Sequence, residues 1–481
     1  MIFSSMSFMV FLIAVLFLYA AADSYRQRAA IILVASLVFY GSWKPSYLFL
    51  LIASLTLNYG FYRILQHSRS RSRAWLSLAL VINLGVLVFF KYLGLIFQTI
   101  ITLGGYFQFP VPVETPSWAQ WALPLGVSFY TFHMLSVMID VYRGDWVRPI
   151  SFRAWSMYVT FFPHMIAGPI LRASELVEQL EKLEPLKLDA VRLGALIFIG
   201  GLIKKVLFAD NLAGIVEPLY AHPEQLSFFT AWLATLAFAL QIYFDFSGYS
   251  EMAVGLACMF GVTLPRNFLY PYVSRSVKEF WQRWHITLSR WLRDYLYISL
   301  GGSHCSFPRN MGNLMITMLL GGLWHGAGWN FVFWGFLHGS YLVGHRLLLH
   351  AYTWAGVTAG SVIDRTLSWL GWPLTFILVC FTWVFFRANT FPDAWHISAT
   401  MLGLAQPSGA IHVIRLSEQV IITVALLLAL LEPHIVAWLQ RQGPLNWWRV
   451  AAPVRGFAYA TLVLALVVFG GDIQKFIYFD F

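Results

Sequence analysis

Apolar stretches of the length that a bilayer requires recur along almost the whole chain. A membrane-crossing helix needs roughly 20 consecutive apolar residues. The 481 residues are 59% hydrophobic and only 11% charged, whereas a soluble protein carries about 25% charged residues. We therefore expect an all-α, polytopic integral membrane protein, forming one membrane-embedded domain over residues 1–481 with about eleven spans. The candidate spans lie near residues 6–22, 29–43, 46–65, 75–98, 120–141, 191–209, 227–246, 328–349, 367–387, 417–440 and 455–471.

Two further apolar segments, near residues 154–171 and 310–323, are short and interrupted by Gly or Pro. Such backbone is tolerated at membrane depth only where protein surrounds it. We expect both segments to be re-entrant or half-spanning helices.

The positive charges indicate the orientation of the chain. Membrane proteins concentrate Lys and Arg in cytoplasmic loops, so the net charge of +10 is not a sign of nucleic-acid binding. Arginines follow the first, third and fifth apolar segments, and the loops between them hold few positive charges. This alternation predicts a periplasmic N-terminus. Because residues 1–9 carry no positive charge, we expect the first segment to be an uncleaved span.

The cysteines give no sign of a metal site or a disulfide. Cys258, Cys305 and Cys380 are scattered without the spacing that either would need. We interpret them as apolar packing residues and predict no metal site.

The run GGLWHGAGWN, residues 321–330, places one histidine inside strongly apolar sequence. An imidazole can take up and return a proton near pH 7, and glycine lets a ligand approach the backbone closely. An ionisable residue in such a setting is a candidate for function. A histidine that is merely hydrogen-bonded between helices would explain His325 equally well at this stage.

Residues 264–309 interleave basic and aromatic residues and are too charged to span a membrane. At about 100° per residue, one helix would place its aromatic residues and His285 on a single face and its arginines on the other. We expect such a helix at the cytoplasmic membrane boundary, or re-entrant, with His285 directed into the protein. Amphipathic packing alone explains the apolar stripe, but not the histidine in it. The predicted face consists of Trp281, Trp284, His285, Leu288, Trp291 and Tyr295.

The runs FWQRWHITLSRW (residues 280–291) and GGLWHG (residues 321–326) together resemble the paired signature of the membrane-bound O-acyltransferases. The runs FFPHMIAGP (161–169) and FDFSGYS (244–250), and both termini, are similar to the bacterial branch of that family that acetylates polysaccharides. The resemblance covers nearly the whole chain. Many members carry Asn where this chain has His285.

The resemblance implies a multi-helix transferase with a tunnel or funnel across the bacterial inner membrane. It implies that His325 is the essential catalytic histidine and His285 the second polar position. The acyl group would come from a cytoplasmic thioester, commonly acetyl-CoA, with no tightly bound cofactor. It would pass to a hydroxyl across the membrane, with membrane lipids, the polysaccharide synthase machinery and a periplasmic acetyltransferase or esterase-like protein as partners.

The expected chemistry needs a base for the attacking hydroxyl and donors for the oxyanion. We expect His325 as the base and His285 as an orienting or polarising group, although a structural hydrogen bond would also account for His285. Trp324, Asn330 and the backbone N–H groups near the glycines are the candidate oxyanion donors.

For three further sets of residues, the sequence is compatible with two roles each. Arg283, Arg290 and Arg293 could bind the phosphates of coenzyme A, or simply mark the cytoplasmic side. Asp245 could form a buried ion pair or contribute to the tunnel. Tyr478, in the aromatic tail, could carry the acyl group in transit, as the resemblance suggests, or be an interfacial anchor.

Other functions remain open for the sequence alone. D-alanyl transfer to teichoic acid and acetylation of peptidoglycan use related chemistry. A non-catalytic transporter of lipid-linked sugar is the alternative from another class. Transporters often show two matching halves, and no such repeat is present in this sequence. The acetylated polymer, alginate or cellulose for example, cannot be named from these residues.

Overall fold

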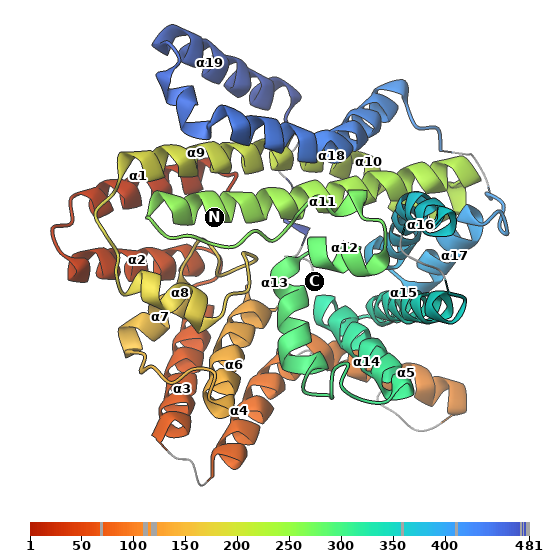
Figure 1. Cartoon of the computed structure of the whole chain (residues 1–481), viewed down its shortest axis with the longest axis horizontal. Helices are drawn as coiled ribbons and strands as arrows, with labels where there is room; N and C mark the ends of the chain where they lie inside the picture. Colours follow the sequence, from red (N-terminus) through yellow and green to blue (C-terminus); the bar gives the residue numbers. More distant parts are fainter. Residues whose placement is uncertain are drawn as a thin grey trace.

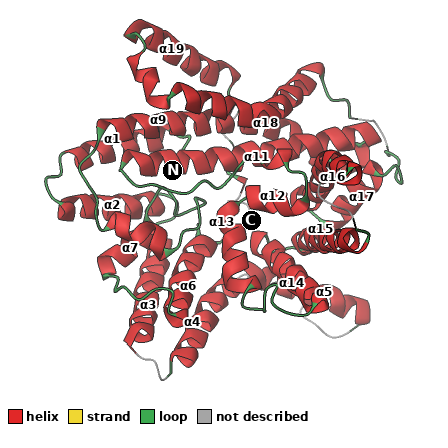
Figure 2. Cartoon of the chain, in the orientation of Figure 1, coloured by secondary structure: helices red, strands yellow, loops and turns green. Residues whose placement is uncertain are grey.

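The computed structural model describes residues 1–67, 71–108, 114–116, 123–356, 360–408, 412–471, 474, 476 and 477, without the side chains of residues 363 and 364. All regular secondary structure in these residues is helical (Figures 1 and 2). The prediction of an all-α protein is confirmed.

Most of the first third of the chain, from red to yellow in Figure 1, lies at the left and lower left of the view, and α5 lies at the lower right. A π-helical turn, η1, interrupts the long helical stretch between α4 and α5. The elements are α1 (Met6–Ala20), α2 (Tyr25–Gly41), α3 (Tyr47–His67), α4 (Ser72–Leu87), η1 (Val88–Tyr92), α5 (Leu93–Phe107), α6 (Val127–Arg143), α7 (Phe152–Thr160) and α8 (Ala173–Leu180).

The middle of the chain contains the longest helix, α11, and a second π-helical turn, η3. Short helices follow α11. The elements are α9 (Leu188–Ile203), η3 (Lys204–Ala209), α10 (Asp210–Ala221), η4 (Pro223–Gln225), α11 (Phe228–Met259), η5 (Pro271–Val273), α12 (Val277–Arg283), α13 (Ile286–Trp291) and the π-helical η6 (Leu292–Tyr297).

The last third begins with two helices that pack against each other, α14 and α15, and ends with α19 at the rim of the molecule (Figure 1). The elements are α14 (Phe307–His325), α15 (Trp329–Trp354), α16 (Val362–Arg387), α17 (Phe391–Met401), α18 (Leu416–Gln442), η7 (Pro444–Arg449) and α19 (Ala452–Phe469).

Six helical stretches in the described residues are long and apolar enough to cross a membrane. This makes the chain an integral membrane protein, and the larger count of about eleven spans remains a prediction. None of the described residues of α19 is buried, which an apolar helix facing lipid allows. The stretches are Tyr47–His67, Ser72–Phe107, Phe228–Met259, Arg365–Arg387, Leu416–Gln442 and Ala452–Phe469.

Helices α9 and α11 lie against each other at two pairs of glycines. A Cβ at Gly194 would lie 2.5 Å from the carbonyl oxygen of Gly255, and one at Gly201 would lie 2.4 Å from that of Gly248. Gly194 and Gly201 are therefore required for the close approach of the two backbones, and small residues are common at such contacts between membrane helices. This contact joins α11 to the π-helical turn η3, which follows α9.

The expected single helix through residues 281–295 is wrong. The structure breaks it between α12 and α13, and His285 stands at the break with a left-handed φ of +41°. The burial of the predicted face is nevertheless correct for Trp284, His285 and Leu288, which are all fully buried. A break with a satisfied backbone can turn a side chain inward as effectively as a continuous helix.

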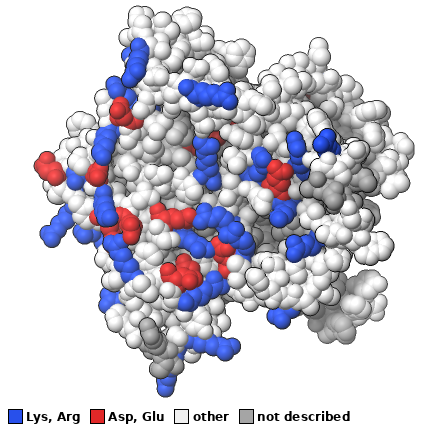
Figure 3. Space-filling model, in the orientation of Figure 1, with Lys and Arg blue, Asp and Glu red and all other residues white. Residues whose placement is uncertain are grey.

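Charged side chains occupy a minor part of the face in Figure 3, and positive and negative groups stand side by side in small clusters. This is the pattern that ion pairs produce. Arg290 and Glu175, for example, form a salt bridge of 2.6 Å between α13 and α8.

Candidate active site

His325 is the last residue of α14, and its side chain is only 3% exposed. Three aromatic rings surround the imidazole, those of Trp324, Trp334 and Phe386, with ring centroids 5.0, 5.1 and 5.3 Å away. They belong to α14, α15 and α16, so the three helices form the walls around this histidine.

His285 is fully buried and is the N-cap residue directly before α13. The helix break before α13 leaves backbone donors that need acceptors, and residue 267 supplies them. The Asn267 carbonyl oxygen accepts from the backbone N–H of Ile286 at 2.9 Å. Its side-chain oxygen accepts from the backbone N–H and the hydroxyl of Thr287, at 3.2 and 3.0 Å, and lies 3.2 Å from His285 Nδ1. Asn267 thus fixes both the break and the imidazole.

The two histidines meet across one indole. The Trp324 ring centroid lies 5.0 Å from that of His325 and 6.2 Å from that of His285. On its other side it packs against Phe129 and Phe132 of α6. The Trp324 Nε1 is buried and has no hydrogen-bond partner in the described part of the chain. The structure therefore brings together the two motif histidines and Trp324.

Neither histidine belongs to the six stretches that can cross the membrane. Burial lowers the pKa of His285 to about 3. Burial, followed by the proximity of His285, holds the pKa of His325 well below its ordinary value. Both rings are therefore neutral at pH 7.

The π-helical turn η1 holds the end of α14, a role that the sequence analysis did not predict. Lys91 Nζ donates to the carbonyl oxygens of Trp324 at 2.5 Å and His325 at 3.2 Å, and the Tyr92 hydroxyl donates to Leu323 O at 2.9 Å. A cation at a helix C-terminus satisfies the last carbonyls and the helix dipole. The available signal was a lone lysine in the apolar segment 75–98.

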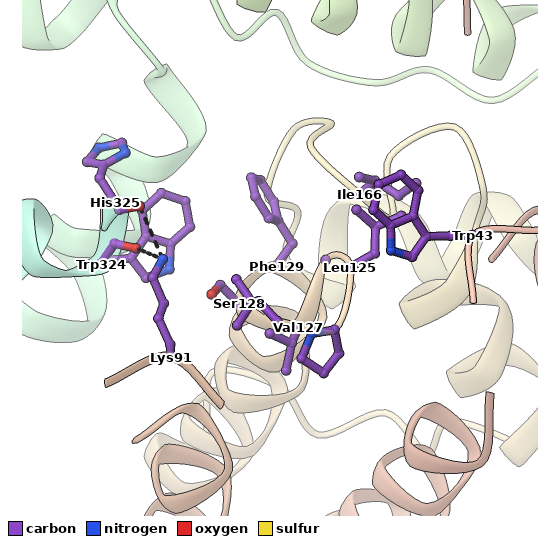
Figure 4. Close-up of a pocket in the computed structure, with 12 residues that line it drawn as sticks. Trp43, Lys91, Leu125, Val127, Ser128, Phe129, Ile166, Trp324 and His325 are labelled. Atoms are coloured by element: carbon purple, nitrogen blue, oxygen red, sulfur yellow. Dashed lines mark hydrogen bonds between the residues drawn. The ribbon is translucent and has the colours of Figure 1, made fainter. Parts of the chain in front are cut away.

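A pocket opens beside this contact (Figure 4). Lys91, Trp324 and His325 form one wall, and Ser128 and Phe129 at the start of α6 face them. The Trp324 indole lies between the His325 ring and Phe129 in this view. The pocket extends from His325 to Trp43, in the loop between α2 and α3.

The glycines after His325 permit a very tight turn into α15. A Cβ at Gly326 would lie 2.2 Å from the Phe331 ring, so no larger residue fits there. Asn330, an expected oxyanion donor, instead gives its amide N–H to the carbonyl oxygen of Ala388 at 3.0 Å. It ties α15 to the end of α16.

The three arginines expected at phosphates all pair with carboxylates in the structure. Arg283 contacts Glu279 at 2.7 Å, Arg290 contacts Glu175, and Arg293 contacts Asp294 at 2.6 Å. Arg290 and Arg293 still line a pocket, whereas Arg283 lies outside it. Basic groups that were not predicted complete its polar side, namely Lys278, His345 and Arg346.

Asp245 forms a buried ion pair, which is one of the two roles that the sequence left open for it. Its Oδ1 lies 2.7 Å from Lys205 Nζ. The next residue, Phe246, packs its ring edge-on against His285 with centroids 4.6 Å apart. Tyr478 lies outside the described residues, but Ile477 donates its backbone N–H to Asp245 Oδ2 at 2.8 Å.

The sequence profile of the membrane-bound O-acyltransferase family matches residues 145–386, which include both histidines. The chain belongs to this family. It is therefore an O-acyltransferase, and the paired histidines are where the family resemblance and the geometry coincide.

Among its relatives, the probable alginate O-acetylase AlgI of Pseudomonas aeruginosa is 41% identical, over 83% of this chain and 75% of that protein. The AlgI protein of Azotobacter vinelandii is also 41% identical, over 83% and 78%. A peptidoglycan O-acetyltransferase of Helicobacter pylori is 35% identical, over 78% of this O-acyltransferase and 73% of its own length.

Proposed function

We propose that this O-acyltransferase transfers acetyl groups from acetyl-CoA, on the cytoplasmic side of the bacterial inner membrane, to an exported polysaccharide such as alginate or cellulose. The observation that carries the proposal is the meeting of His285 and His325 across Trp324 in a buried, aromatic site. The 41% identity to alginate O-acetylases supports acetyl as the acyl group.

In the proposed reaction His325 takes the proton of the attacking hydroxyl as the hydroxyl oxygen bonds to the thioester carbonyl carbon. The C–S bond then breaks, and the thiol leaves with a proton. General-base catalysis of this kind contributes typically 10²–10⁴-fold. The neutral state of His325 supports this assignment. His285, held by Asn267, orients the site, and Trp324 Nε1 is the candidate donor to the oxyanion.

The donor would bind in the pocket lined by Arg290 and Arg293. Its basic residues suit phosphates, and apolar residues such as Leu314 and Met318 suit the pantetheine arm. Ile286, directly after His285, also lines this pocket. The pocket therefore extends to the segment that carries His285. Arg283 lies outside this pocket and pairs with Glu279.

The C-terminal tail would carry the acyl group in transit on Tyr478, by attack of its phenol on the thioester and later transfer to the acceptor. Support comes from Phe476, whose ring lies 5.6 Å from that of Phe246, itself in contact with His285. A periplasmic acetyltransferase or esterase-like partner, acting with the polysaccharide synthase, would complete the transfer.

The decisive experiment compares variants in cells that secrete the polymer. His325→Ala should abolish acetylation while the polymer is still exported, because only the chemistry is lost. Tyr478→Phe should abolish acetylation if the tail carries the acyl group. Acetyl content of purified polymer, measured by NMR, gives the readout. Loss of export in His325→Ala would favour a transporter, and normal acetylation in Tyr478→Phe would remove the relay.

Peptidoglycan is the second candidate acceptor, favoured by the 35% identity to the Helicobacter pylori enzyme. Acetyl analysis of the cell wall in the same His325→Ala strain separates the two acceptors. A loss from the wall alone would assign peptidoglycan.

A further inference from the structure

A buried ion cluster lies where η3, α10 and α11 meet. Lys205 Nζ is 2.7 Å from Asp210 Oδ1 and 2.7 Å from Asp245 Oδ1, and all three side chains are at most 6% exposed. A buried charge is costly unless it is paired and hydrogen-bonded. One ammonium group cannot neutralise two carboxylates, so the cluster calls for further donors.

The C-terminal segment brings such a donor. The backbone N–H of Ile477 donates to Asp245 Oδ2 at 2.8 Å. A backbone donor is present whatever the side chains of the tail are. It reaches the carboxylate, however, only when the tail residues lie at fixed positions along the cluster.

The segment begins with a close crossing over η3 and α10. A Cβ at Gly471 would lie 2.8 Å from the backbone nitrogen of Asn211, so only glycine fits this crossing. The Asn211 side chain donates to Phe469 O at 2.7 Å, and Gly471 N–H donates to Val206 O at 3.4 Å. These bonds direct the chain from the end of α19 into the bundle.

An aromatic anchor completes the contact. Phe476 is only 2% exposed, and its ring stacks on Tyr249 with centroids 4.5 Å apart. It also packs against Phe246, which contacts His285. The tail therefore reaches to within one ring of the histidine pair.

We infer that the Lys205–Asp210–Asp245 cluster is the docking site for the chain's own C-terminal segment, and that Asp245 is its main positioning residue. Docking seats Phe476 beside the ring that contacts His285. A catalytic role for the position of Phe476 rests on the proposed function, whereas the docking of the tail does not.

The chain contains a matched control for this cluster. Lys204, the neighbour of Lys205 in η3, also pairs with two carboxylates, Glu251 at 2.5 Å and Glu432. Removing one carboxylate from either cluster leaves a one-to-one pair. Asp245→Ala and Glu251→Ala thus make the same change in net charge, but only the first removes a contact with the tail.

The test is digestion of the purified, detergent-solubilised full chain with a carboxypeptidase, followed by intact mass. Wild type should resist trimming at Ile477, and Asp245→Ala should be trimmed through Gln474 at least about tenfold faster, the effect of one lost charge-assisted hydrogen bond. Asp245→Asn should recover part of the protection, because its amide oxygen can still accept from Ile477. Glu251→Ala should behave as wild type.

Thermal unfolding shows whether Asp245→Ala is folded. If it is not, Phe476→Ala is the second variant, because it should release the tail and leave the ion cluster intact. The inference is overturned if wild type is trimmed past Gln474 as fast as Asp245→Ala, or if Glu251→Ala is as sensitive as Asp245→Ala. Polymer acetylation is measured separately. Released tails with normal acetylation would contradict the acyl relay and leave the docking site standing.

Discussion

At the scale of single residues, the site depends on a backbone conformation that few side chains adopt. His285 has a φ of +41°, where a Cβ crowds the following carbonyl and non-glycine residues lose roughly 1–2 kcal/mol. Asparagine tolerates this region better than most residues. A change from His to Asn at this position therefore has a backbone rationale as well as a chemical one.

A series of substitutions at position 285 separates the two explanations. His285→Asn should keep the thermal stability of the wild type, and His285→Val should lose about 1–2 kcal/mol, because a β-branched side chain is strained at this φ. Unfolding in detergent measures the first effect. Polymer acetylation should follow the order His, Asn, Ala if the polar group also orients the site. Equal stability of the Asn and Val variants would contradict the backbone explanation.

At the scale of elements, η1 and η3, two of the three π-helical turns in the described part of the chain, position charged groups that regular helices would place elsewhere. The η1 turn directs Lys91 to the end of α14, and the η3 turn gives Lys204 and Lys205 separate carboxylate partners. π-helical turns occur frequently at functional sites. Here η1 supports the end of α14, which carries His325, and η3 supplies the lysine that pairs with Asp245.

The glycine contact between α9 and α11 sets the position of η3, and neighbouring glycines test it. Gly201→Ala should destabilise the protein by about 1–3 kcal/mol, because its Cβ would lie 2.4 Å from Gly248 O and force the helices apart. Gly200→Ala meets nothing within 4 Å and should be neutral or slightly stabilising. Thermal unfolding of both variants gives the comparison. Similar losses in both would mean that glycine flexibility, and not the close contact, matters.

At the scale of the whole molecule, the orientation in the membrane decides which pocket faces which substrate. The distribution of arginines predicts a periplasmic N-terminus. The pocket beside Trp43 would then open to the periplasm, and the basic pocket would face the donor.

Cysteine labelling tests this orientation. In a chain whose three cysteines are replaced by Ala, Lys44→Cys should react with a membrane-impermeant maleimide in intact spheroplasts. Asp23→Cys should react only after permeabilisation. Both positions are exposed, so access depends only on the side of the membrane. The reverse pattern would invert the topology.

The sequence alone was sufficient for the fold class and for the two histidines. Apolar segments of bilayer length leave the backbone no alternative to internal hydrogen bonding, so helices follow from composition and length. The histidines stand in local runs that are distinctive by themselves. The charged face of residues 281–295 was also evident, although the helix carrying it was predicted without its break.

Only the tertiary structure decided which polar groups meet. Asn267, Lys91 and Lys205 act on partners more than 15 residues away, or through π-helical turns, and local sequence carries no record of either. The same holds for the arginines, which the sequence left open to phosphate and the structure pairs with carboxylates. A buried charge is governed by whichever opposite charge folding brings within about 3 Å, and that distance is a property of the packed helices.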